Sequence, residues 1–240
     1  MAKQGIDISY CQTNVNWNTL NVDFVLMRAG YGRYAYQKDA MFEKHYAGAC
    51  SRNIPKGAYW YSYAMSEAEA REEARVCIQI LKGKKFEYPI YFDVEEQAQF
   101  NLGRAKVSAI VKAFCTEMEK AGYWVGLYTN TNWYINVIDD EIKTRYAIWI
   151  AHWDVAKPGI SGPYGIWQYK VGTINGVAGR CDLDYSYVDY PTEIKKAGLN
   201  GYPKPAPTPA PAPAPVPKKK TITASVVVDG KTYKGTLTEV

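Results

Sequence analysis

The stretch Tyr88-Pro89-Ile90-Tyr91-Phe92-Asp93-Val94-Glu95 decides the fold, because it begins as an apolar, aromatic run and ends in acid. The apolar run predicts a buried strand. Residues two apart in a strand point to the same side, so Asp93 and Glu95 should project together. Two close carboxylates raise the pKa of at least one of them, which a general acid near neutral pH requires. The alternative interpretation is that both are solvated acids at the beginning of a helix that follows the strand.

The sequence up to residue 202 alternates strand-like apolar runs with amphipathic helix patterns. Ser66-Glu67-Ala68-Glu69 has the spacing of a capping box and predicts where a helix begins. The glycines at 30 and 32 predict the end of the second strand. Five strand–helix units followed by helix-poor strands predict an α/β fold with a barrel-like sheet, whose site would lie at the carboxyl ends of the strands. Besides 88–95, strands are predicted over residues 4–9, 23–29, 54–64, 123–128, 147–153, 165–169 and 181–185, and helices over 39–51, 66–82 and 104–121.

Acidic residues lie at the predicted carboxyl ends of several strands. They are Asp7, Asp93, Glu95, Asp182 and Asp184, and an α/β barrel gathers its catalytic groups in this layer. Carboxylates among aromatic rings suit glycoside hydrolysis, in which one acid protonates the leaving oxygen and a second group assists at the anomeric carbon. Core packing is the competing interpretation for about half of the aromatic residues. The aromatic residues of this layer are Tyr59, Tyr61, Tyr128, Trp149, Trp153, Trp167 and Tyr169.

Composition argues against several other classes of protein. The chain has a net charge of +5, but the segment from Pro203 onward carries six lysines against Asp229 and Glu239. The body is therefore nearly neutral, which argues against nucleic-acid binding. The five cysteines are widely spaced without a CxxC pair, which favours reduced thiols over a disulfide framework. The two histidines, His45 and His152, are too isolated to indicate a zinc site, and no cofactor or metal is implied.

The C-terminal part of the sequence differs in composition from the rest. Residues 203–217 alternate proline with mainly alanine and run into three lysines at 218–220, which predicts an extended polyproline spacer. Residues 221–228 and 231–237 alternate on either side of Asp229-Gly230, which predicts a β-hairpin. One hairpin is barely stable alone in water, so it should pair with another copy or another surface, or be a fragment. We therefore expect three parts: a domain over 1–202, a linker over 203–220 and a hairpin over 221–240.

Five motifs together resemble glycoside hydrolase family 25, the Ch-type lysozymes, over about residues 3–191. The resemblance implies a flattened TIM-like (β/α)5(β)3 barrel. It also implies N-acetylmuramidase activity, which cuts the β-1,4 bond between N-acetylmuramic acid and N-acetylglucosamine in peptidoglycan. The motifs are Gly5-Ile6-Asp7-Ile8-Ser9, Phe92-Asp93-Val94-Glu95, Trp149-Ile150-Ala151-His152-Trp153, Trp167-Gln168-Tyr169 and Asp182-Leu183-Asp184.

The same resemblance implies roles for individual residues. Glu95 matches the general acid, and Asp93 matches a group that positions or stabilises the reacting sugar. Asp7 and Asp182 match the remaining acidic positions of the cleft, and Asp184 matches a secondary position. The residues expected to bind substrate are Tyr59, Tyr61, Tyr128, Trp149, Trp153, Gln168, Tyr169 and Asp184.

Alternatives remain open for the mechanism and for the activity itself. We expect the acetamido oxygen of the substrate to take part, oriented by Asp93, instead of a direct carboxylate nucleophile or an inverting water. A family 18 chitinase would need an aspartate where Tyr91 stands, and a catalytically inactive wall-binding lectin would not need Glu95. Tyr59-Trp60-Tyr61 departs from the Tyr-His-Phe pattern of many members, which affects a sugar subsite but not the carboxylates.

The resemblance and the linker together suggest a phage or prophage endolysin. Residues 1–6 contain no hydrophobic signal region, and no apolar stretch is long enough to span a bilayer. We expect synthesis in the bacterial cytoplasm and action on the cell wall after release. The expected partners are peptidoglycan glycan strands and, through the hairpin, another copy of the chain.

Overall fold

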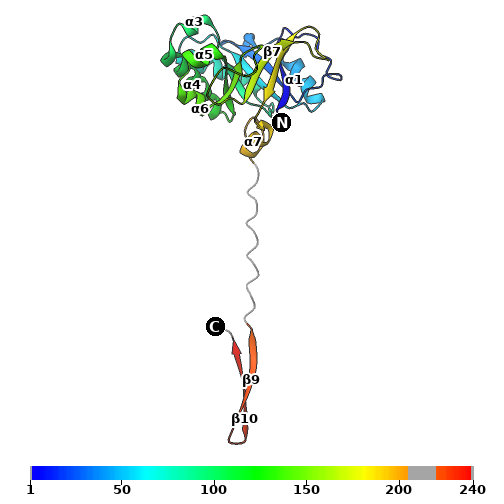
Figure 1. Cartoon of the computed structure of the whole chain (residues 1–240), viewed down its shortest axis with the longest axis vertical. Helices are drawn as coiled ribbons and strands as arrows, with labels where there is room; N and C mark the ends of the chain where they lie inside the picture. The colour runs from blue at the N-terminus through cyan, green and yellow to red at the C-terminus, as the bar shows by residue number, and fades with distance from the viewer. Residues whose placement is uncertain (1, 205–219, 239–240) are drawn as a thin grey trace. The chain divides into compact units, whose positions relative to one another are not determined.

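The computed structural model describes residues 2–204 and 220–238. The chain divides into two compact units, Met1–Pro205 and Ala206–Val240 (Figure 1). Most of the predicted proline–alanine linker, residues 205–219, lies outside the described residues.

Eight strands of the first unit close into a barrel in the order β1 to β8. Neighbours from β1 to β7 are parallel, whereas β8 runs antiparallel to both β7 and β1. The predicted α/β barrel is thereby confirmed, with one strand reversed. The strands are β1 (Lys3–Ile8), β2 (Phe24–Tyr31), β3 (Lys56–Tyr61), β4 (Ile90–Asp93), β5 (Val125–Asn130), β6 (Ala147–Ala151), β7 (Ile166–Gly172) and β8 (Cys181–Ser186).

Helices pack on the outside of the barrel; Figure 1 shows α4, α5 and α6 beside it, with α1 at the other side of the view. In the described part of the chain, helical crossovers follow β2, β3, β4 and β5, but a loop joins β1 to β2. The prediction of five strand–helix units was therefore wrong by one. The helices are η1 (Ala35–Gln37), α1 (Phe42–Ser51), α2 (Glu67–Leu81), α3 (Gln97–Phe100), α4 (Arg104–Lys120), α5 (Thr131–Asn136), α6 (Asp140–Arg145) and α7 (Tyr190–Ala197).

One local prediction is corrected by the structure, and another is confirmed. Gly30 does not end the second strand, because β2 continues to Tyr31 with a register shift between Arg28 and Gly30. A Cβ at Gly30 would lie 2.6 Å from the Trp60 ring, so this glycine permits close packing and not a turn. The predicted beginning of α2 is confirmed, because Ser66 is its N-cap and accepts a hydrogen bond from the Glu69 amide; the Glu69 carboxylate accepts from the amide of Met65.

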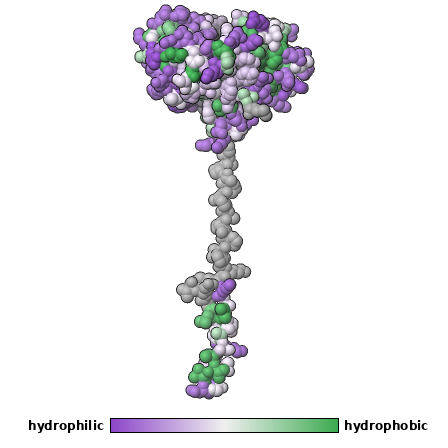
Figure 2. Space-filling view, in the orientation of Figure 1, coloured by the Kyte–Doolittle hydropathy of each residue, from purple (hydrophilic) through white to green (hydrophobic). Residues whose placement is uncertain are grey.

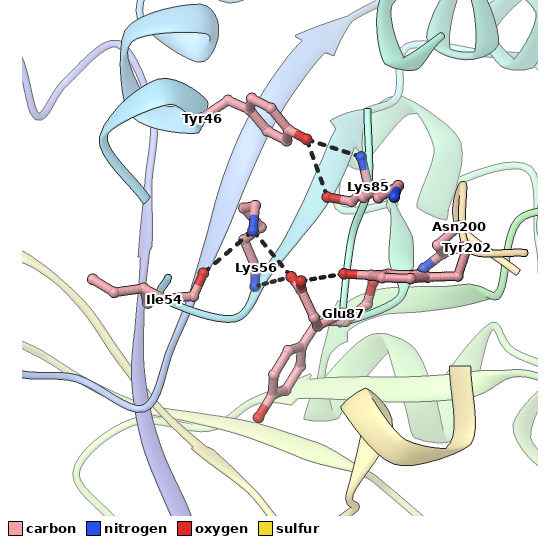
Figure 3. A network of polar contacts seen from close by, with 8 residues as sticks. Tyr46, Ile54, Lys56, Lys85, Glu87, Asn200 and Tyr202 are labelled. Atoms are coloured by element: carbon pink, nitrogen blue, oxygen red, sulfur yellow. Dashed lines mark hydrogen bonds and ion pairs between the residues drawn. The ribbon is translucent and has the colours of Figure 1, made fainter. Parts of the chain in front are cut away.

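At the amino-terminal end of the barrel, Asn200 and Tyr202 from the segment after α7 join a network of polar contacts (Figure 3). The Glu87 carboxylate accepts hydrogen bonds from the amide and Nζ of Lys56, both at 3.1 Å, and from the Tyr202 hydroxyl. Asn200 is fully buried; its side chain accepts from Trp124 N at 2.7 Å and donates to Tyr88 O at 2.9 Å. Lys56 and Glu87 are therefore paired with each other, and their side chains are only 7% and 13% exposed.

The second unit is the predicted β-hairpin. Strands β9 (Thr221–Val228) and β10 (Lys231–Thr238) pair antiparallel from Val228–Lys231 to Thr221–Thr238. Asp229 and Gly230 have φ values of 47° and 74°, as a type I′ turn requires. The hairpin prediction is confirmed, with β10 one residue longer than expected.

Candidate active site

The alternation of side chains along the strands sends acids and aromatic rings into the barrel. In β4, Ile90 and Phe92 pack in the cluster that faces the helices, whereas Tyr91 belongs to the interior cluster with Trp149. Because side chains alternate, Asp93 follows Tyr91 to the interior. Each acid of the site occupies such an interior position in its own strand, or lies beyond the strand end.

Two of the acids reach the same rim of the barrel from strands that run in opposite directions. Asp7 lies near the carboxyl end of β1 and pairs in register with Asp182. Asp182 is the second residue of β8, so the prediction that it lies at a carboxyl end was wrong. Because β8 is antiparallel to its neighbours, its amino end meets their carboxyl ends, and the acids are brought together all the same.

Asp93 and Glu95 form the centre of the site. Asp93 is the last residue of β4 and only 3% exposed, and its Oδ1 has no hydrogen-bond partner in the described residues. Burial, and then the charge of Glu95, raises the pKa of Asp93 well above its usual value. Glu95 is partly buried two residues beyond the strand. Burial, followed by the charges of Glu96 and Asp182, raises its pKa too. The interpretation of Asp93 as a solvated helix-cap acid was wrong, because the following helix, α3, begins at Gln97.

Asp7 is held by a hydrogen-bond network that includes two of the predicted substrate-binding aromatics. Gln168 donates to Asp7 Oδ2 at 2.8 Å. The Oε1 atom of Gln168 accepts from the Tyr128 hydroxyl at 3.0 Å and from Trp153 Nε1 at 2.9 Å. Burial, and then the charges of Asp184 and Asp182, raises the pKa of Asp7 well above its usual value. Trp153 is 49% exposed, so its ring offers a face to a ligand while its nitrogen is fixed.

Asp184 and Trp149 lie below this network and are fully enclosed. Trp149 Nε1 donates to Asp184 Oδ1 at 2.8 Å, whereas Asp184 Oδ2 has no partner among the described residues. Burial raises the pKa of Asp184 well above its usual value. Since Trp149 is 1% exposed, the structure places this pair beneath the site and not on its surface.

The remaining aromatic candidates occupy three different environments. Tyr59 is buried and packs edge-on against Trp149, at 5.7 Å between ring centroids. The Tyr61 hydroxyl donates to Glu96 Oε1 at 2.6 Å, beside the acidic pair. Tyr169 stacks on Tyr185 at 4.4 Å and packs against the outer cluster of side chains. The structure therefore brings Tyr61 to the acids but does not bring Tyr169 there.

Two hollows lie beside the carboxylates. One, of about 540 Å³, is lined by Glu95 and Tyr128, with Trp153 and His152 at its side. The other, of about 560 Å³, is lined by Tyr61, Arg28 and further tyrosines. An extended ligand could thus lie on both sides of the acidic pair. Sequence reasoning missed Glu96 and Arg28, although an arginine inside the otherwise apolar run 24–29 is a signal that could have found the second.

Other chemical features of the described ranges are few. Within residues 2–204 and 220–238, no group of three or more His, Cys, Asp and Glu side chains is placed to hold a metal ion. No helix of those ranges has the length and apolarity needed to cross a bilayer. All five cysteines are free thiols, with Cys11 and Cys50 exposed.

An eight-stranded α/β barrel with a carboxylate-lined rim is an arrangement that glycoside hydrolases use. The chain belongs to glycosyl hydrolases family 25, whose family model matches residues 6–177.

Individual relatives agree with this assignment. The autolytic lysozyme of Clostridium acetobutylicum is 29% identical over 187 residues, which are 75% of this chain and 55% of that protein. The chain thus spans little more than half the length of that relative. The structure of the CTP1L endolysin is similar with a TM-score of 0.71 and 24% identity, over 80% of this chain and 69% of that one. The structure of the autolysin LytC from Streptococcus pneumoniae in complex with a synthetic peptidoglycan ligand is similar with a TM-score of 0.70 and 26% identity. The match covers 78% of this chain and 47% of that one.

Proposed function

We propose that the protein is a lysozyme that hydrolyses the β-1,4 bond between N-acetylmuramic acid and N-acetylglucosamine in peptidoglycan. The observation that carries the proposal is the partly buried Glu95 beside the buried Asp93, which lacks a partner on Oδ1 in the described residues. Family membership and the lysozyme relative support the choice of reaction, and the peptidoglycan ligand of LytC supports the substrate.

In this proposal Glu95 is the general acid. Its raised pKa keeps it protonated nearer to neutral pH, so it can donate a proton to the leaving glycosidic oxygen. Asp93 lies on the same rim and receives the acetamido group of the sugar, whose oxygen attacks the anomeric carbon as the glycosidic bond breaks. Water then opens the resulting oxazolinium ion, and Glu95 takes the proton of that water.

Asp7 and Asp182 complete the acidic rim, and Gln168 and Tyr128 hold Asp7 in place. Trp153, Tyr128 and Tyr61 line the hollows on either side of the acids, where flat ring faces can hold sugar rings. Trp149, Tyr59 and Asp184 support this surface from beneath, and Tyr169 does so from the outer side of the barrel.

Digestion of purified, peptide-crosslinked cell walls tests the reaction. Released fragments should carry muramic acid at the reducing end, as read by borohydride reduction and mass spectrometry. Reducing-end N-acetylglucosamine would instead indicate a glucosaminidase. Binding to walls without new reducing ends would support a wall-binding lectin.

Proton NMR of the first product tests the acetamido mechanism separately. The mechanism predicts a β anomer at early time, because two displacements retain configuration. An initial α anomer would contradict it without affecting the identity of the bond that is cut.

We further propose that the protein is an endolysin, made in the bacterial cytoplasm and released to the wall at lysis. Its likeness to the CTP1L endolysin supports this origin. Expressed in its host without any export signal, the full chain should leave growing cells intact. It should lyse them within minutes of membrane permeabilisation; lysis before permeabilisation would contradict the proposal.

We also propose that the hairpin binds a second copy of this chain. Two cross-strand pairs, Ile222–Leu237 and Val226–Tyr233, lie on one face, and these side chains are 57% to 67% exposed. The other face is mainly polar, with Thr223 and Thr236, although it also carries Val227. Figure 2 shows hydrophobic residues in green on this unit. Identical apolar faces are self-complementary, and a two-stranded sheet needs such a partner to be stable.

Sedimentation of the full chain tests the pairing. The wild type should have twice the mass of the double variant Ile222→Lys, Val226→Lys. The matched variant Thr223→Lys on the polar face should keep the wild-type mass. A monomeric wild type, or equal masses for all three proteins, would overturn self-association. If the apolar variants instead lost binding to cell walls, wall docking would take its place.

A further inference from the structure

The hollow on the Tyr61 side of the acidic pair contains a positively charged group that the proposed reaction does not use. Its volume is about 560 Å³. Tyr61 pairs in register with Asp93, so the hollow begins directly beside the centre of the site. Its wall is mostly aromatic, with one guanidinium: it is lined by Tyr10, Arg28, Tyr31, Tyr36, Lys38, Asp39, Ala40, Tyr61 and Tyr63.

Arg28 is held in one orientation by Asp39. Its Nε donates to Asp39 Oδ2 at 2.7 Å, and the Asp39 carboxylate also accepts from the amides of Tyr10 and Met41, at 3.0 and 2.9 Å. The guanidinium carbon lies 4.6 Å from the centre of the Tyr10 ring and 5.7 Å from that of Tyr31. The aromatic contacts and the ion pair together leave this side chain little freedom.

The terminal nitrogens of Arg28 remain available to a ligand. The side chain is 17% exposed, and within residues 2–204 and 220–238 only Nε makes a hydrogen bond. A guanidinium has five N–H donors in a planar fork that matches a carboxylate. The other four donors therefore have no hydrogen-bond partner in the described part of the chain, and Arg28 lines the hollow.

Arg28 also lies close to the reacting centre. Burial, and then the charge of Glu95, raises the pKa of Asp93, and the charge of Arg28 opposes this rise. A negatively charged group on the substrate would be repelled by the acids of the rim. The hollow around Arg28 is where such a group can be neutralised without leaving the vicinity of Asp93.

We propose that Arg28 and the tyrosines around it form a subsite for a carboxylate carried on the lactyl branch of the muramic acid residue. The inference rests on the proposed function, because it assigns a recognition element to that reaction. The carboxylate is either the lactyl group itself, in glycan free of peptide, or a carboxylate of the stem peptide attached to it. A sugar without the lactyl branch leaves the guanidinium fork empty, so the subsite favours muramic acid over N-acetylglucosamine beside the bond that is cut.

Matched substrates that differ in one charge test this subsite. Glycan strands freed of peptide carry lactyl carboxylates, and methyl esterification neutralises them without changing the glycosidic bond. The full chain should cut the acid strands with a kcat/KM at least about 10-fold above that of the ester, the discrimination expected of a charge-assisted hydrogen bond. In Arg28→Met this ratio should fall to about 1. In Arg28→Lys it should be intermediate, because a point charge replaces the fork.

Arg33→Met is the matched control, because Arg33 is a cation on a neighbouring loop that pairs with Glu69 outside this hollow. It should keep the wild-type ratio. Binding of both strands to Glu95→Gln protein, measured by calorimetry, gives the same comparison without turnover. If no wall substrate is cut but the acid strands still bind more tightly than the ester, the lysozyme proposal fails and the subsite stands.

The remaining outcomes decide between the two sources of the carboxylate, or reject the subsite. A loss in Arg28→Met that is confined to peptide-bearing strands assigns the carboxylate to the stem peptide. A loss of equal size on acid, ester and peptide-bearing strands would overturn the subsite, because Arg28 would then act only through Asp93 or through folding. The subsite would also be overturned if the wild-type protein neither cut nor bound carboxylate-bearing strands in preference to their methyl esters, whether or not the strands carried peptide.

Discussion

Both ends of the barrel hold ionisable groups away from solvent, but the groups are paired at one end, whereas at the other some of their oxygens lack partners in the described part of the chain. At the amino-terminal end, Lys56 and Glu87 are paired with each other, and Glu87 also accepts from Tyr202. At the carboxyl-terminal rim, Asp93 and Asp184 are buried with an oxygen that has no partner in the described residues. Buried charge is costly unless it is paired. The difference therefore separates groups that stabilise the fold from groups kept for chemistry.

The pKa directions at the two ends agree with this contrast. Burial alone would raise the pKa of Glu87, but hydrogen bonds from Tyr202 and the charge of Lys56 lower it. The rim acids have raised pKa values because burial is reinforced by like charges. Glu87 thus stabilises the fold at pH values above its ordinary pKa, and this stabilisation is lost as the pH falls through its lowered folded-state pKa. The rim acids favour folding most at low pH, where they are protonated, and less as pH rises.

The largest expected effect of a single change is on catalysis at the rim. Glu95→Gln keeps the shape of the side chain but removes the proton, so kcat on peptidoglycan should fall by about 10²–10⁴-fold. Glu96→Gln is the matched neighbour and should cost less than about 10-fold, since Tyr61 can still donate to the amide oxygen. Reducing-end assays on both variants check the pair. Equal losses would mean that Glu95 is not the proton donor.

The largest expected effect on stability lies at the opposite end. Lys56→Met leaves Glu87 buried without its cation, which should lower the free energy of unfolding by about 3–5 kcal/mol. The activity of the remaining folded protein should not change, because Lys56 lies at the end of the barrel away from the acids. Urea unfolding and a rate per folded molecule measure the two quantities. If Lys56→Met were as stable as wild type but inactive, Lys56 would serve catalysis and not the stability of the fold.

Glu73 in α2 provides a smaller effect that depends on pH. Burial raises its pKa to about 7, and its Oε1 accepts from the amide of Tyr63, next to the Arg28 hollow. A raised folded-state pKa means that the contribution to stability is greatest below pH 4.5 and is lost as pH rises to about 7, amounting to about 3 kcal/mol. Glu73→Gln should remove this loss. The difference in unfolding free energy between wild type and variant, followed from pH 4 to 8, isolates Glu73 from the rim acids. A difference that is constant with pH would contradict the prediction.

Much of the barrel and of its acidic rim could be predicted from sequence because both follow local patterns. Alternation along β4 places Asp93 inside, and the apolar stripe of α4 places that helix outside. The direction of β8 could not be read locally, because only pairing with β1 and β7 determines it. Tyr169 was expected in the cleft because it lies at the predicted carboxyl end of its strand, yet alternation sends it to the side opposite Gln168. Arg28 was missed because its partner Asp39 lies beyond the end of the strand, on a loop.

The unfolding temperature of Asp93→Asn, measured beside its activity and beside Lys56→Met at pH 7, tests the contrast between the two ends most directly. Asparagine removes a buried carboxylate, one of whose oxygens has no partner in the described residues, so the unfolding temperature should be no lower than that of wild type. The same change should cause a large loss of kcat. Lys56→Met should show the reverse pattern. If Asp93→Asn unfolds at a clearly lower temperature and keeps its activity, Asp93 is a structural group, and the distinction between the paired end and the reactive rim is wrong.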